Sequence, residues 1–501
     1  MAPALRERER TETPSALAEW EALATCPKEL MVDGAWRPAR SGQTLAVEDP
    51  ATGEALCDVA DAGAPDVADA LAAGAGAQAA WAAAPPRDRA RVLRRAADAL
   101  QREHDRIAML ITLEMGKPLA ESRDEVTFAA EYLEWAAEEA VRVQGASGDD
   151  PDGSARLIID RRPVGPCLII SPWNFPLAIP ARGAASALAA GCTVVLRPSS
   201  LAPLSALALA AVLEEAGLPP GALNVIVSSR DDATDGLLAD PRLRRLTFTG
   251  STLVGRHLAG LAARNLLPAG LELGGQAPFI VFADADLAAA VECAVAAKMR
   301  NGGAACTAAN AFHVEAPVAT AFAELLAERL ADLVLGRGTE PGVDLGPMVG
   351  ARQARRLQEL IEDAVGRGAG VALPGGALEG PGHFVAPAVL TDPAPAARVM
   401  NEEIFGPIAP VCRFDREDEL LARVNACEQG LAAYVHTRDL DRALRVGQAL
   451  DVGMVAVNRG RVSSVAAPFG GAKGSGWGRA GGPDALRDYL ETRYLAIGRA
   501  A

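Results

Sequence analysis

The sequence predicts an α/β protein with more than one lobe. Its 501 residues exceed what a single hydrophobic core usually holds, so two or more lobes are expected. From about residue 167 onward, short apolar runs alternate with helical segments. The runs are hydrophobic throughout rather than at every second position, a pattern typical of strands buried on both faces of a parallel sheet.

The first third of the chain is expected to be mainly helical. Residues 1–30 are charged and polar and are predicted to form a loosely held tail. A hairpin is expected around Gly34, ahead of long stretches rich in Ala, Leu and Arg. The predicted helices are 64–82, 86–116 and 119–143, and the Gly-Asp-Asp-Pro-Asp-Gly run at 148–153 ends this helical part.

Two series of strands and helices follow. In the first, strands are predicted at 167–171, 193–196, 223–227 and 246–249, with helices at 177–190, 202–217, 231–238 and 251–265. The second series begins near residue 278 and runs to about 480, with helices at 284–299, 316–334 and 350–367. The chain then ends in a strand-like segment, 489–495.

Composition and charge exclude several classes of protein. With 23% charged and 50% hydrophobic residues, the chain is typical of soluble globular proteins rather than disordered ones. A formal net charge of −15 repels phosphates at long range, so nucleic-acid and membrane partners are not expected. No apolar run reaches the roughly 18 residues needed to span a bilayer, and residues 1–30 lack the apolar stretch of a signal peptide. We therefore expect a cytoplasmic protein.

The cysteines and histidines do not form a pattern that binds a metal ion. The eight cysteines are scattered without a CxxC spacing, and the five histidines are isolated. No metal site is expected, and a reducing compartment is the simplest interpretation.

Two predicted strand ends could receive an anionic ligand. After the strand at 246–249 the chain passes through Gly250 and Ser251 into a helix, a geometry that points free backbone N–H groups at a phosphate. Arg197-Pro198-Ser199-Ser200 follows another strand and offers donors without a carboxylate. The alternatives are an ordinary α/β turn in the first case and a loop with hydroxyl groups in the second.

The candidate chemistry lies in a Gly-rich segment that ends in Cys306. A helix is expected directly after this cysteine, and its N-terminal dipole would lower the thiol pKa. The alternative is a buried, inert thiol. Glu272 is flanked by leucines and glycines, so we expect it to be desolvated, with the raised pKa that suits a general base. The alternative is a surface glutamate at a strand end.

These segments occur in one order together with several others. They are Leu113-Glu114-Met115-Gly116-Lys117-Pro118, Pro172-Trp173-Asn174-Phe175-Pro176, the Arg-Pro-Ser-Ser loop, Phe248-Thr249-Gly250-Ser251, Glu272-Leu273-Gly274-Gly275, Cys306, Glu402-Glu403-Ile404-Phe405-Gly406-Pro407, Pro468-Phe469-Gly470-Gly471 and Tyr489-Leu490-Glu491. The ordered set resembles the aldehyde dehydrogenase superfamily, from about residue 31 to the end of the chain.

The resemblance implies the fold of that family, with a Rossmann-type parallel-sheet cofactor domain, an α/β catalytic domain and a small β flap for oligomerisation. The cofactor domain would comprise 31–149 and 167–272, the catalytic domain 273–480, and the flap 150–166 with 486–501. An exposed terminal strand needs a partner for its edge, so a homodimer or homotetramer is expected.

The resemblance also implies the chemistry. Cys306 would add to the carbonyl of a small aldehyde to form a thiohemiacetal. The Asn174 side-chain amide and the Cys306 backbone N–H would hold the oxyanion. Loss of a hydride to the nicotinamide would leave a thioester, and Glu272 would activate the water that hydrolyses it.

The resemblance implies NADP in preference to NAD, or the use of both cofactors. Family members that prefer NAD commonly carry a glutamate at the position of Ser200, where its charge would repel a 2′-phosphate. Ser200 together with Arg197 would accept that phosphate. The cofactor residues that the resemblance implies are Trp173, Arg197, Pro198, Ser199, Ser200, Gly250, Ser251, Leu273, Glu403 and Phe405.

Among the subfamilies, the chain is most similar to the NADP-dependent succinate-semialdehyde dehydrogenases. These recognise the distal carboxylate of the substrate with two arginines and a serine, which match Arg182, Arg300 and Ser463. The alternatives are that Arg182 pairs with an acidic neighbour and that Arg300 stabilises the loop before the nucleophile.

Some positions depart from the family pattern. Arg197 stands where lysine is usual. Ala304 and Ala305 replace Gln and Thr, and Ala136 replaces an aromatic residue at the substrate entrance, so a larger or neutral aldehyde is an alternative substrate. Ala308 stands in place of a second cysteine, which excludes an intramolecular redox switch at that point.

Functions of other classes are also open. One is a cysteine hydrolase or acyltransferase without a nicotinamide, against which Glu403 and the Gly250-Ser251 turn count. Another is a non-catalytic binding protein on the same fold, and a third is a CoA-acylating enzyme. The presence of Cys306, Glu272 and Asn174 together disfavours the binding protein, and the presence of Glu272 for hydrolysis disfavours the CoA-acylating enzyme.

Overall fold

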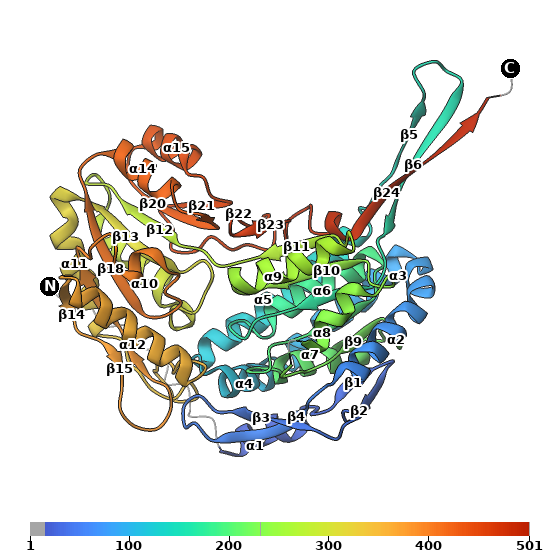
Figure 1. The fold of residues 1–501 in the computed structure, drawn as a ribbon, viewed down its shortest axis with the longest axis horizontal. Helices are drawn as coiled ribbons and strands as arrows, with labels where there is room; N and C mark the ends of the chain where they lie inside the picture. Colours follow the sequence, from blue (N-terminus) through green and yellow to red (C-terminus); the bar gives the residue numbers. More distant parts are fainter. Residues whose placement is uncertain (1–15, 231, 500–501) are drawn as a thin grey trace.

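An eight-stranded sheet forms the centre of the first lobe in the computed structural model, which describes residues 16–230 and 232–499 (Figure 1). In spatial order its strands are β2 (Ala35–Arg37), β1 (Leu30–Val32), β9 (Leu223–Val225), β8 (Val194–Arg197), β7 (Cys167–Ile170), β10 (Arg245–Thr249), β11 (Ala269–Glu272) and β23 (Gly476–Trp477). The strands from β9 to β11 pair in parallel, whereas β1 and β23 pair antiparallel with their neighbours.

The helices of this lobe agree largely with the expected ones. They are α2 (Ala64–Ala83), α3 (Pro86–Arg102), α4 (His104–Met115), α5 (Leu119–Ala140), α6 (Ala178–Ala190), α7 (Leu204–Glu215), α8 (Asp232–Asp235) and α9 (Thr252–Arg264). The single helix predicted over 86–116 is wrong, because Glu103 leaves the helical conformation and separates α3 from α4. The helix expected over 231–238 is the short α8 followed by a 3₁₀ turn, and residue 231 lies outside the described residues.

Both faces of the sheet are covered by helices, as its continuous apolar strands predict. Ile169 and Leu196 point into a core that includes residues of α3, α5, α6 and α7. Leu168 and Val195, the alternate residues of the same strands, point into a core that includes residues of α2 and α9. The sheet is therefore buried on both sides, which is the condition for a stable parallel sheet.

The strand order predicts a ligand site at the carboxyl ends of two neighbouring central strands, β7 and β10. The chain runs from β7 through β8 to β9 in one direction, and β10 and β11 lie on the other side of β7. The order reverses between β7 and β10, and in open α/β sheets ligands collect at the carboxyl ends of the strands at such a point. The segments that follow these two strands contain Trp173 and Asn174 on one side and Gly250 and Ser251 on the other.

The N-terminal tail expected over 1–30 is wrong for the described residues 16–30. Residues 16–25 form α1 (Ala16–Thr25), and Ala22 and Cys26 are buried in the core of the first lobe. Glu19 forms an ion pair with Arg337 at 3.0 Å. The apolar residues of this segment pack against the core of the first lobe, a tertiary contact that the local charge pattern of the sequence does not predict. Residues 1–15 lie outside the described residues.

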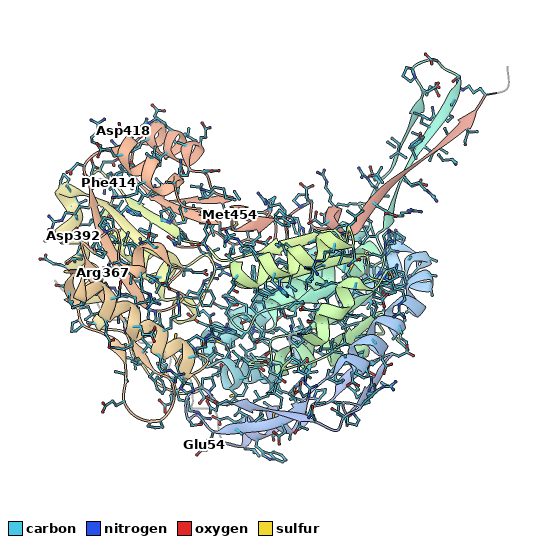
Figure 2. The ribbon with its side chains drawn as sticks, in the orientation of Figure 1. Glu54, Arg367, Asp392, Phe414, Asp418 and Met454 are labelled. Atoms are coloured by element: carbon cyan, nitrogen blue, oxygen red, sulfur yellow. The ribbon has the colours of Figure 1, made fainter. Side chains whose placement is uncertain are left out.

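The second lobe is built on a seven-stranded sheet. In spatial order its strands are β14 (Gly370–Leu373), β17 (Ala388–Thr391), β18 (Ile408–Phe414), β13 (Ala309–Glu315), β12 (Ala277–Val281), β20 (Ala432–His436) and β21 (Met454–Val457), and all pairs except β14–β17 are parallel. Asp392, Phe414 and Met454 mark this lobe in Figure 2, whereas Glu54 marks the first lobe. Its main helices are α10 (Leu287–Met299), α11 (Ala316–Ala331), α12 (Ala351–Gly366), α14 (Glu417–Asn425) and α15 (Leu440–Ala449).

A three-stranded antiparallel sheet projects away from both lobes (Figure 1). It consists of β5 (Ala146–Asp149), β6 (Ala155–Pro163) and β24 (Leu490–Gly498), so it begins before the flap boundary expected at residue 150. The side chains of Tyr494, Leu495 and Ile497 on the edge strand β24 are exposed. An exposed apolar edge of this kind is a surface for pairing with another chain.

The remaining strands form short pairs at the surface. They are β3 (Thr44–Glu48) with β4 (Ala55–Ala60), β15 (Gly376–Ala377) with β16 (Val385–Ala386), and β19 (Gln429–Gly430) with β22 (Ala472–Lys473), and a short helix, α13 (Arg398–Asn401), precedes β18. Within residues 16–230 and 232–499, no helix is both long and apolar enough to cross a membrane.

Candidate active site

Cys306 lies in a tight loop between α10 and β13. The backbone of Asn301, Gly302 and Gly303 has positive φ angles of 58°, 60° and 78°. A Cβ atom at Gly303 would lie 2.4 Å from the carbonyl oxygen of Gly406, so only glycine fits this approach. The close contact brings the cysteine loop against the segment that contains Glu403 and Phe405 and explains the glycine-rich sequence.

The helix expected directly after Cys306 is absent from the structure at that position. Residues Ala309–Glu315 form the central strand β13, and the apolar run that follows the cysteine belongs to this strand. Burial raises the pKa of the Cys306 thiol to about 12, with a further increase from Glu403 and opposing effects of Arg182 and Arg300. The prediction of a lowered thiol pKa is therefore wrong for this state, because no helix dipole offsets the burial.

Glu272 is the last residue of β11 and is buried, as its leucine and glycine neighbours predict. Only 7% of its surface is exposed, so the alternative of a surface glutamate is wrong. Burial raises the pKa of its carboxyl group to about 8, against the opposing charges of Arg182 and Arg479. Its Oε2 atom has no hydrogen-bond partner within the described part of the chain. A carboxyl group in this state can take up a proton near neutral pH.

Asn174 contacts the cysteine loop directly. Its Nδ2 atom donates a hydrogen bond of 2.8 Å to the carbonyl oxygen of Ala304. An amide nitrogen carries two hydrogens, so a second N–H remains available for an oxygen near Cys306. The backbone oxygen of Asn174 accepts hydrogen bonds from Asn301 Nδ2 and Lys117 Nζ, both at 2.8 Å. The loop after β7 and the loop before β13 are thus joined through Asn174.

A buried ion pair supports this arrangement and was not expected from the sequence. Lys117 Nζ lies 2.6 Å from Glu125 Oε2, and Glu125 Oε1 accepts hydrogen bonds from the backbone N–H groups of Leu177 and Ala178. These two N–H groups belong to the start of α6, where a negative charge is favourable. Lys117 belongs to the quoted Glu-Met-Gly-Lys-Pro motif, which was the one signal in the sequence for its role.

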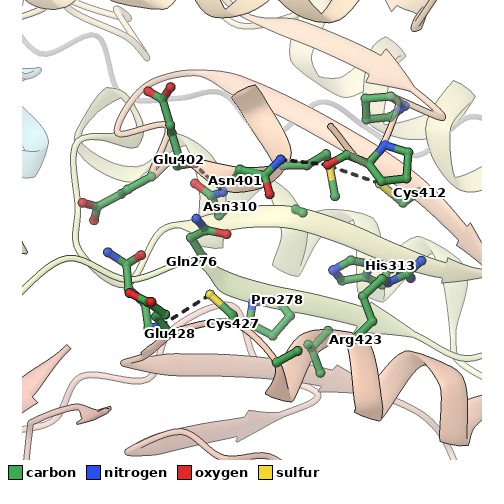
Figure 3. Close-up of a pocket in the computed structure, with 18 of the residues that line it drawn as sticks. Gln276, Pro278, Asn310, His313, Asn401, Glu402, Cys412, Arg423, Cys427 and Glu428 are labelled. Atoms are coloured by element: carbon green, nitrogen blue, oxygen red, sulfur yellow. Dashed lines mark hydrogen bonds between the residues drawn. The ribbon is translucent and has the colours of Figure 1, made fainter. Parts of the chain in front are cut away.

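A cavity of about 1060 Å³ opens between the two lobes (Figure 3). Residues of both lobes line it, among them Ser251, Glu403 and Phe405. Figure 3 shows Gln276, Asn310, Glu402, Cys427 and Glu428 around the same cavity. Its size is sufficient for a ligand of dinucleotide dimensions.

Glu403 reaches from the second lobe onto the glycines that follow β11. Its Oε1 atom accepts a hydrogen bond of 3.1 Å from Gly275 N, and a Cβ atom at Gly274 would lie 2.3 Å from its Oε2 atom. Burial raises the pKa of the Glu403 carboxyl group to about 7. Phe405 meets Trp173 edge to face, with the ring centroids 5.5 Å apart. Together they provide an aromatic wall and a carboxylate near the cysteine loop.

The residues expected at the other end of a cofactor lie on neighbouring strand ends of the first lobe. Ser251 caps α9, where its Oγ atom accepts a hydrogen bond from Val254 N. Leu273 packs against Gly255, where a Cβ atom would lie 2.4 Å from Leu273 Cδ2. Arg197 ends β8 and donates hydrogen bonds to the carbonyl oxygens of Ser228 and Arg230. The loop over 198–200 follows β8, and the described lining of the large cavity does not include it.

The two expected substrate arginines lie near Cys306 and pack on aromatic rings. The Cζ atom of Arg182 lies 4.7 Å from the centroid of Phe469, and that of Arg300 lies 5.4 Å from the centroid of Phe175. Within residues 16–230 and 232–499, neither guanidinium has a carboxylate oxygen within the 4 Å of an ion pair. Arg300 also donates to Thr307 Oγ1 at 3.3 Å, a contact that its loop-stabilising alternative predicts.

Ser463 and Tyr132 complete the surroundings of Arg182. Ser463 shares a cavity of about 220 Å³ with Phe469, the ring on which Arg182 packs. Tyr132 of α5 forms a hydrogen bond with Arg182, and its role was missed in the sequence. Ala136, one turn further along α5, is only 2% exposed and lies in the core of the first lobe, so it does not widen an entrance.

The described residues hold no group of three or more His, Cys, Asp or Glu side chains that could bind a metal ion. Ala304 and Ala305, which replace polar residues before the nucleophile, are both buried.

Comparisons with known proteins agree with this geometry. Residues 36–495 match the model of the family described as "Aldehyde dehydrogenase family". The chain is 48% identical over 444 residues to a succinate-semialdehyde dehydrogenase of Paenarthrobacter nicotinovorans, covering 88% of this chain and 98% of the relative. It is 45% identical over 473 residues to a glutarate-semialdehyde dehydrogenase of Pseudomonas aeruginosa, covering 94% and 98% of the two chains. It superposes on the crystal structure of an E. coli NADP-dependent enzyme with a TM-score of 0.93 and 42% identity, covering 97% and 100%.

Proposed function

Because the chain belongs to the aldehyde dehydrogenase family and is an NAD(P)-dependent aldehyde dehydrogenase, we propose that it oxidises succinate semialdehyde to succinate, with NADP as its preferred cofactor. The observation that carries this substrate is the pair of guanidinium groups of Arg182 and Arg300 beside Cys306, stacked on phenylalanine rings instead of ion-paired. Two such groups suit a distal carboxylate. The names of the two relatives given above also describe aldehydes that end in a carboxylate.

The reaction starts from a neutral thiol. Because burial keeps the pKa of Cys306 near 12, a base must remove its proton before attack. Arg182 and Arg300 act to lower this pKa, so they stabilise the thiolate, and the thiol proton passes to a water molecule of the solvent. The thiolate forms a bond to the aldehyde carbon, and the carbonyl electron pair moves to the oxygen. The free N–H of Asn174 and the backbone N–H of Cys306 hold the resulting oxyanion.

The large cavity and its walls fit a nicotinamide dinucleotide. The aromatic pair of Trp173 and Phe405 suits a flat ring, and Glu403 can accept hydrogen bonds from ribose hydroxyls. The backbone N–H group of Ser251, at the start of α9, suits a pyrophosphate, whereas Gly250 N donates to the carbonyl oxygen of Glu272 at 3.0 Å and brings its backbone alongside. When bound, the cofactor supplies the acceptor for the hydride that leaves the thiohemiacetal carbon. Loss of this hydride converts the thiohemiacetal on Cys306 into a thioester.

Hydrolysis of the thioester then regenerates the enzyme. Glu272 takes a proton from a water molecule, whose oxygen attacks the thioester carbon. The Cys306 sulfur leaves, and the acid product is released. The same oxyanion donors stabilise the tetrahedral state of this second attack.

The preference for NADP rests on Ser200 and Arg197. Ser200 carries no charge that would repel a 2′-phosphate, and Arg197, three residues earlier, ends β8. The E. coli structure to which the chain is similar is likewise described as NADP-dependent. Pro198 and Ser199 belong to the same loop, and Leu273 packs against Gly255 in the first part of α9.

The proposal also covers the organisation of the chain. We assign residues 31–145 and 167–272 to the cofactor domain and 273–480 to the catalytic domain. Residues 146–166 and 486–499 belong to a flap, which begins with β5, and its apolar edge joins copies of the chain in a homodimer or homotetramer.

Formation of the reduced cofactor by the purified protein tests the proposed function. We expect kcat/KM for succinate semialdehyde with NADP to exceed that for butanal, and Cys306→Ala to abolish both reactions. Activity on butanal but none on succinate semialdehyde would refute the substrate while leaving the family intact.

A further inference from the structure

A third arginine, Arg461, lies beside the two that face the nucleophile. It belongs to the loop between β21 and β22, and its Cζ atom lies 5.2 Å from the ring centroid of Phe128 on α5. Arg300 is an electrostatic neighbour of both Arg461 and Cys306. The three guanidinium groups therefore belong to one positively charged cluster near the nucleophile.

Helix α5 shows how far Arg461 is displaced from Arg182. Tyr132, which bonds Arg182, and Phe128, on which Arg461 packs, are one helical turn apart, and their rings lie 4.7 Å from each other. One turn corresponds to about 5–6 Å along a helix. Arg182 is only 7% exposed, whereas Arg461 lies on the exposed side. Of these two arginines, Arg461 is therefore the one nearer the solvent.

Within the described residues, the three arginines pack on aromatic rings without an ion pair, whereas Arg442, which also lies over a phenylalanine ring, is paired with Asp284. Each guanidinium lies over a phenylalanine ring, Phe469, Phe175 or Phe128. Asp124 and Glu131 attract Arg461 electrostatically, but over the described ranges no carboxylate oxygen lies within the 4 Å of an ion pair with it. A guanidinium held over a ring keeps its N–H groups directed outward for an anionic ligand.

In the proposed function, Arg182 and Arg300 bind the carboxylate of a four-carbon semialdehyde, and both are electrostatic neighbours of Cys306. Each added methylene lengthens the tail between the carbonyl and the carboxylate. Arg461, an electrostatic neighbour of Arg300, offers a further guanidinium for the carboxylate of such a longer tail.

We infer that Arg461 is a specificity-determining residue that binds the distal carboxylate of semialdehydes with five or more carbons. This inference rests on the proposed function, because it needs an anionic tail bound by Arg182 and Arg300. It extends the substrate class from the four-carbon semialdehyde to its longer homologues. Arg461 contacts the tail alone and takes no part in the chemistry at Cys306.

Arg461→Gln tests this inference, with Arg459→Gln as the matched control. Arg459 lies two residues earlier on the same loop and is exposed, so both variants remove one positive charge from one loop. We would measure kcat and KM for succinate semialdehyde, glutarate semialdehyde and pentanal. In Arg461→Gln we expect KM for glutarate semialdehyde to rise about tenfold or more, the value for losing a charged hydrogen bond. The values for pentanal should stay unchanged, which also shows that the variant is folded.

A larger rise in KM for glutarate semialdehyde than for succinate semialdehyde in Arg461→Gln, with no such difference in Arg459→Gln, supports the inference. Equal effects of Arg461→Gln on both semialdehydes, or no effect on either, would overturn it. A wild-type enzyme that oxidises pentanal but neither semialdehyde would instead refute the proposed function, so the two failures are distinguishable.

Discussion

The ammonium group of Lys117 lies 2.6 Å from the carboxylate of Glu125, and both side chains are almost fully buried. Lys117 also donates to the backbone oxygen of Asn174, and Glu125 accepts two N–H groups at the start of α6. The pair therefore joins two helices of the first lobe to the loop that presents the oxyanion donor. It links the stability of the lobe with the geometry of the site.

Lys117→Met should destabilise the protein strongly. The substitution leaves the charge of Glu125 buried without its partner, which typically costs about 3–5 kcal/mol. The unfolding midpoint in urea should fall, and kcat should fall as well because the Asn174 loop loses a support. Arg102→Gln is the control, since it breaks an exposed ion pair with Glu215 at 2.7 Å and should cost about 1 kcal/mol or less. Equal midpoints for the two variants would contradict the role of the buried pair.

The pH dependence of turnover should report Glu272. Burial raises the pKa of this carboxyl group from 4.5 to about 8, so in the empty enzyme it is protonated at pH 7 and becomes a base as the pH rises. We expect kcat, where thioester hydrolysis limits the rate, to increase from pH 6 to about pH 8 and then level off. A profile that is already level between pH 5 and pH 7 would show that Glu272 is not the base.

Glu272→Gln should separate the two halves of the reaction. Without the base for water, the thioester on Cys306 persists, and turnover should fall by about 10²–10⁴. Mass spectrometry of the intact protein after mixing with substrate and cofactor should then detect the acyl adduct. The exposed Glu54 gives a matched control, because Glu54→Gln removes the same charge from a surface position that does not line the large cavity. If both variants lost activity, the loss of a negative charge in general, and not the base at Glu272, would explain the effect.

Much of the architecture could be predicted, because it depends on local patterns. The continuous apolar runs predict the parallel sheet, and Gly250-Ser251 lies at a strand–helix junction where the motif predicts it. The helix expected after Cys306 was wrong because a short apolar run fits a buried strand as well as a helix, and only pairing with β12 and β18 decides. The prediction of a lowered pKa for the Cys306 thiol was wrong for the same reason, because it depended on that helix.

The contacts that join distant parts of the chain were not accessible from the sequence. Lys117 and Asn174 are 57 residues apart, and Arg461 meets Phe128 from the opposite end of the chain. Such neighbours depend on the tertiary fold, and no periodicity or local motif encodes them. The pairing of α1 with the first lobe was missed for the same reason.

Gly303→Ala should damage the site through the backbone. The new Cβ atom would lie 2.4 Å from the carbonyl oxygen of Gly406, at a φ of 78° that side chains rarely adopt. The cysteine loop must shift, so kcat should drop by about tenfold or more, as small displacements of a nucleophile cost large factors. Gly76→Ala in α2 is the control, because a Cβ atom there meets nothing within 4 Å. It should leave kcat unchanged and stabilise the helix by about 0.5–1 kcal/mol. A Gly303→Ala enzyme with full activity would contradict the close contact.

Ser200→Glu should shift the cofactor preference. The new carboxylate would repel the 2′-phosphate of NADP and leave NAD, which lacks it, less affected. The ratio of kcat/KM for NADP to that for NAD should fall by about tenfold or more, which corresponds to about 1.4 kcal/mol. Ser464→Glu, at an exposed position in the loop before Phe469, adds the same charge and should leave the ratio unchanged. The same ratio in wild type and Ser200→Glu would remove Ser200 from the phosphate site.

The most direct test of the central claim is the ratio of kcat/KM for succinate semialdehyde to that for butanal, measured in the wild type and in Arg182→Gln. Arg182 is buried over Phe469 beside Cys306, so its loss removes a charged donor for the substrate carboxylate while the nucleophile remains. We expect the ratio to fall by about tenfold or more, mainly through a higher KM for the semialdehyde. An unchanged ratio, with both substrates affected equally, would contradict a carboxylate-binding site at Arg182.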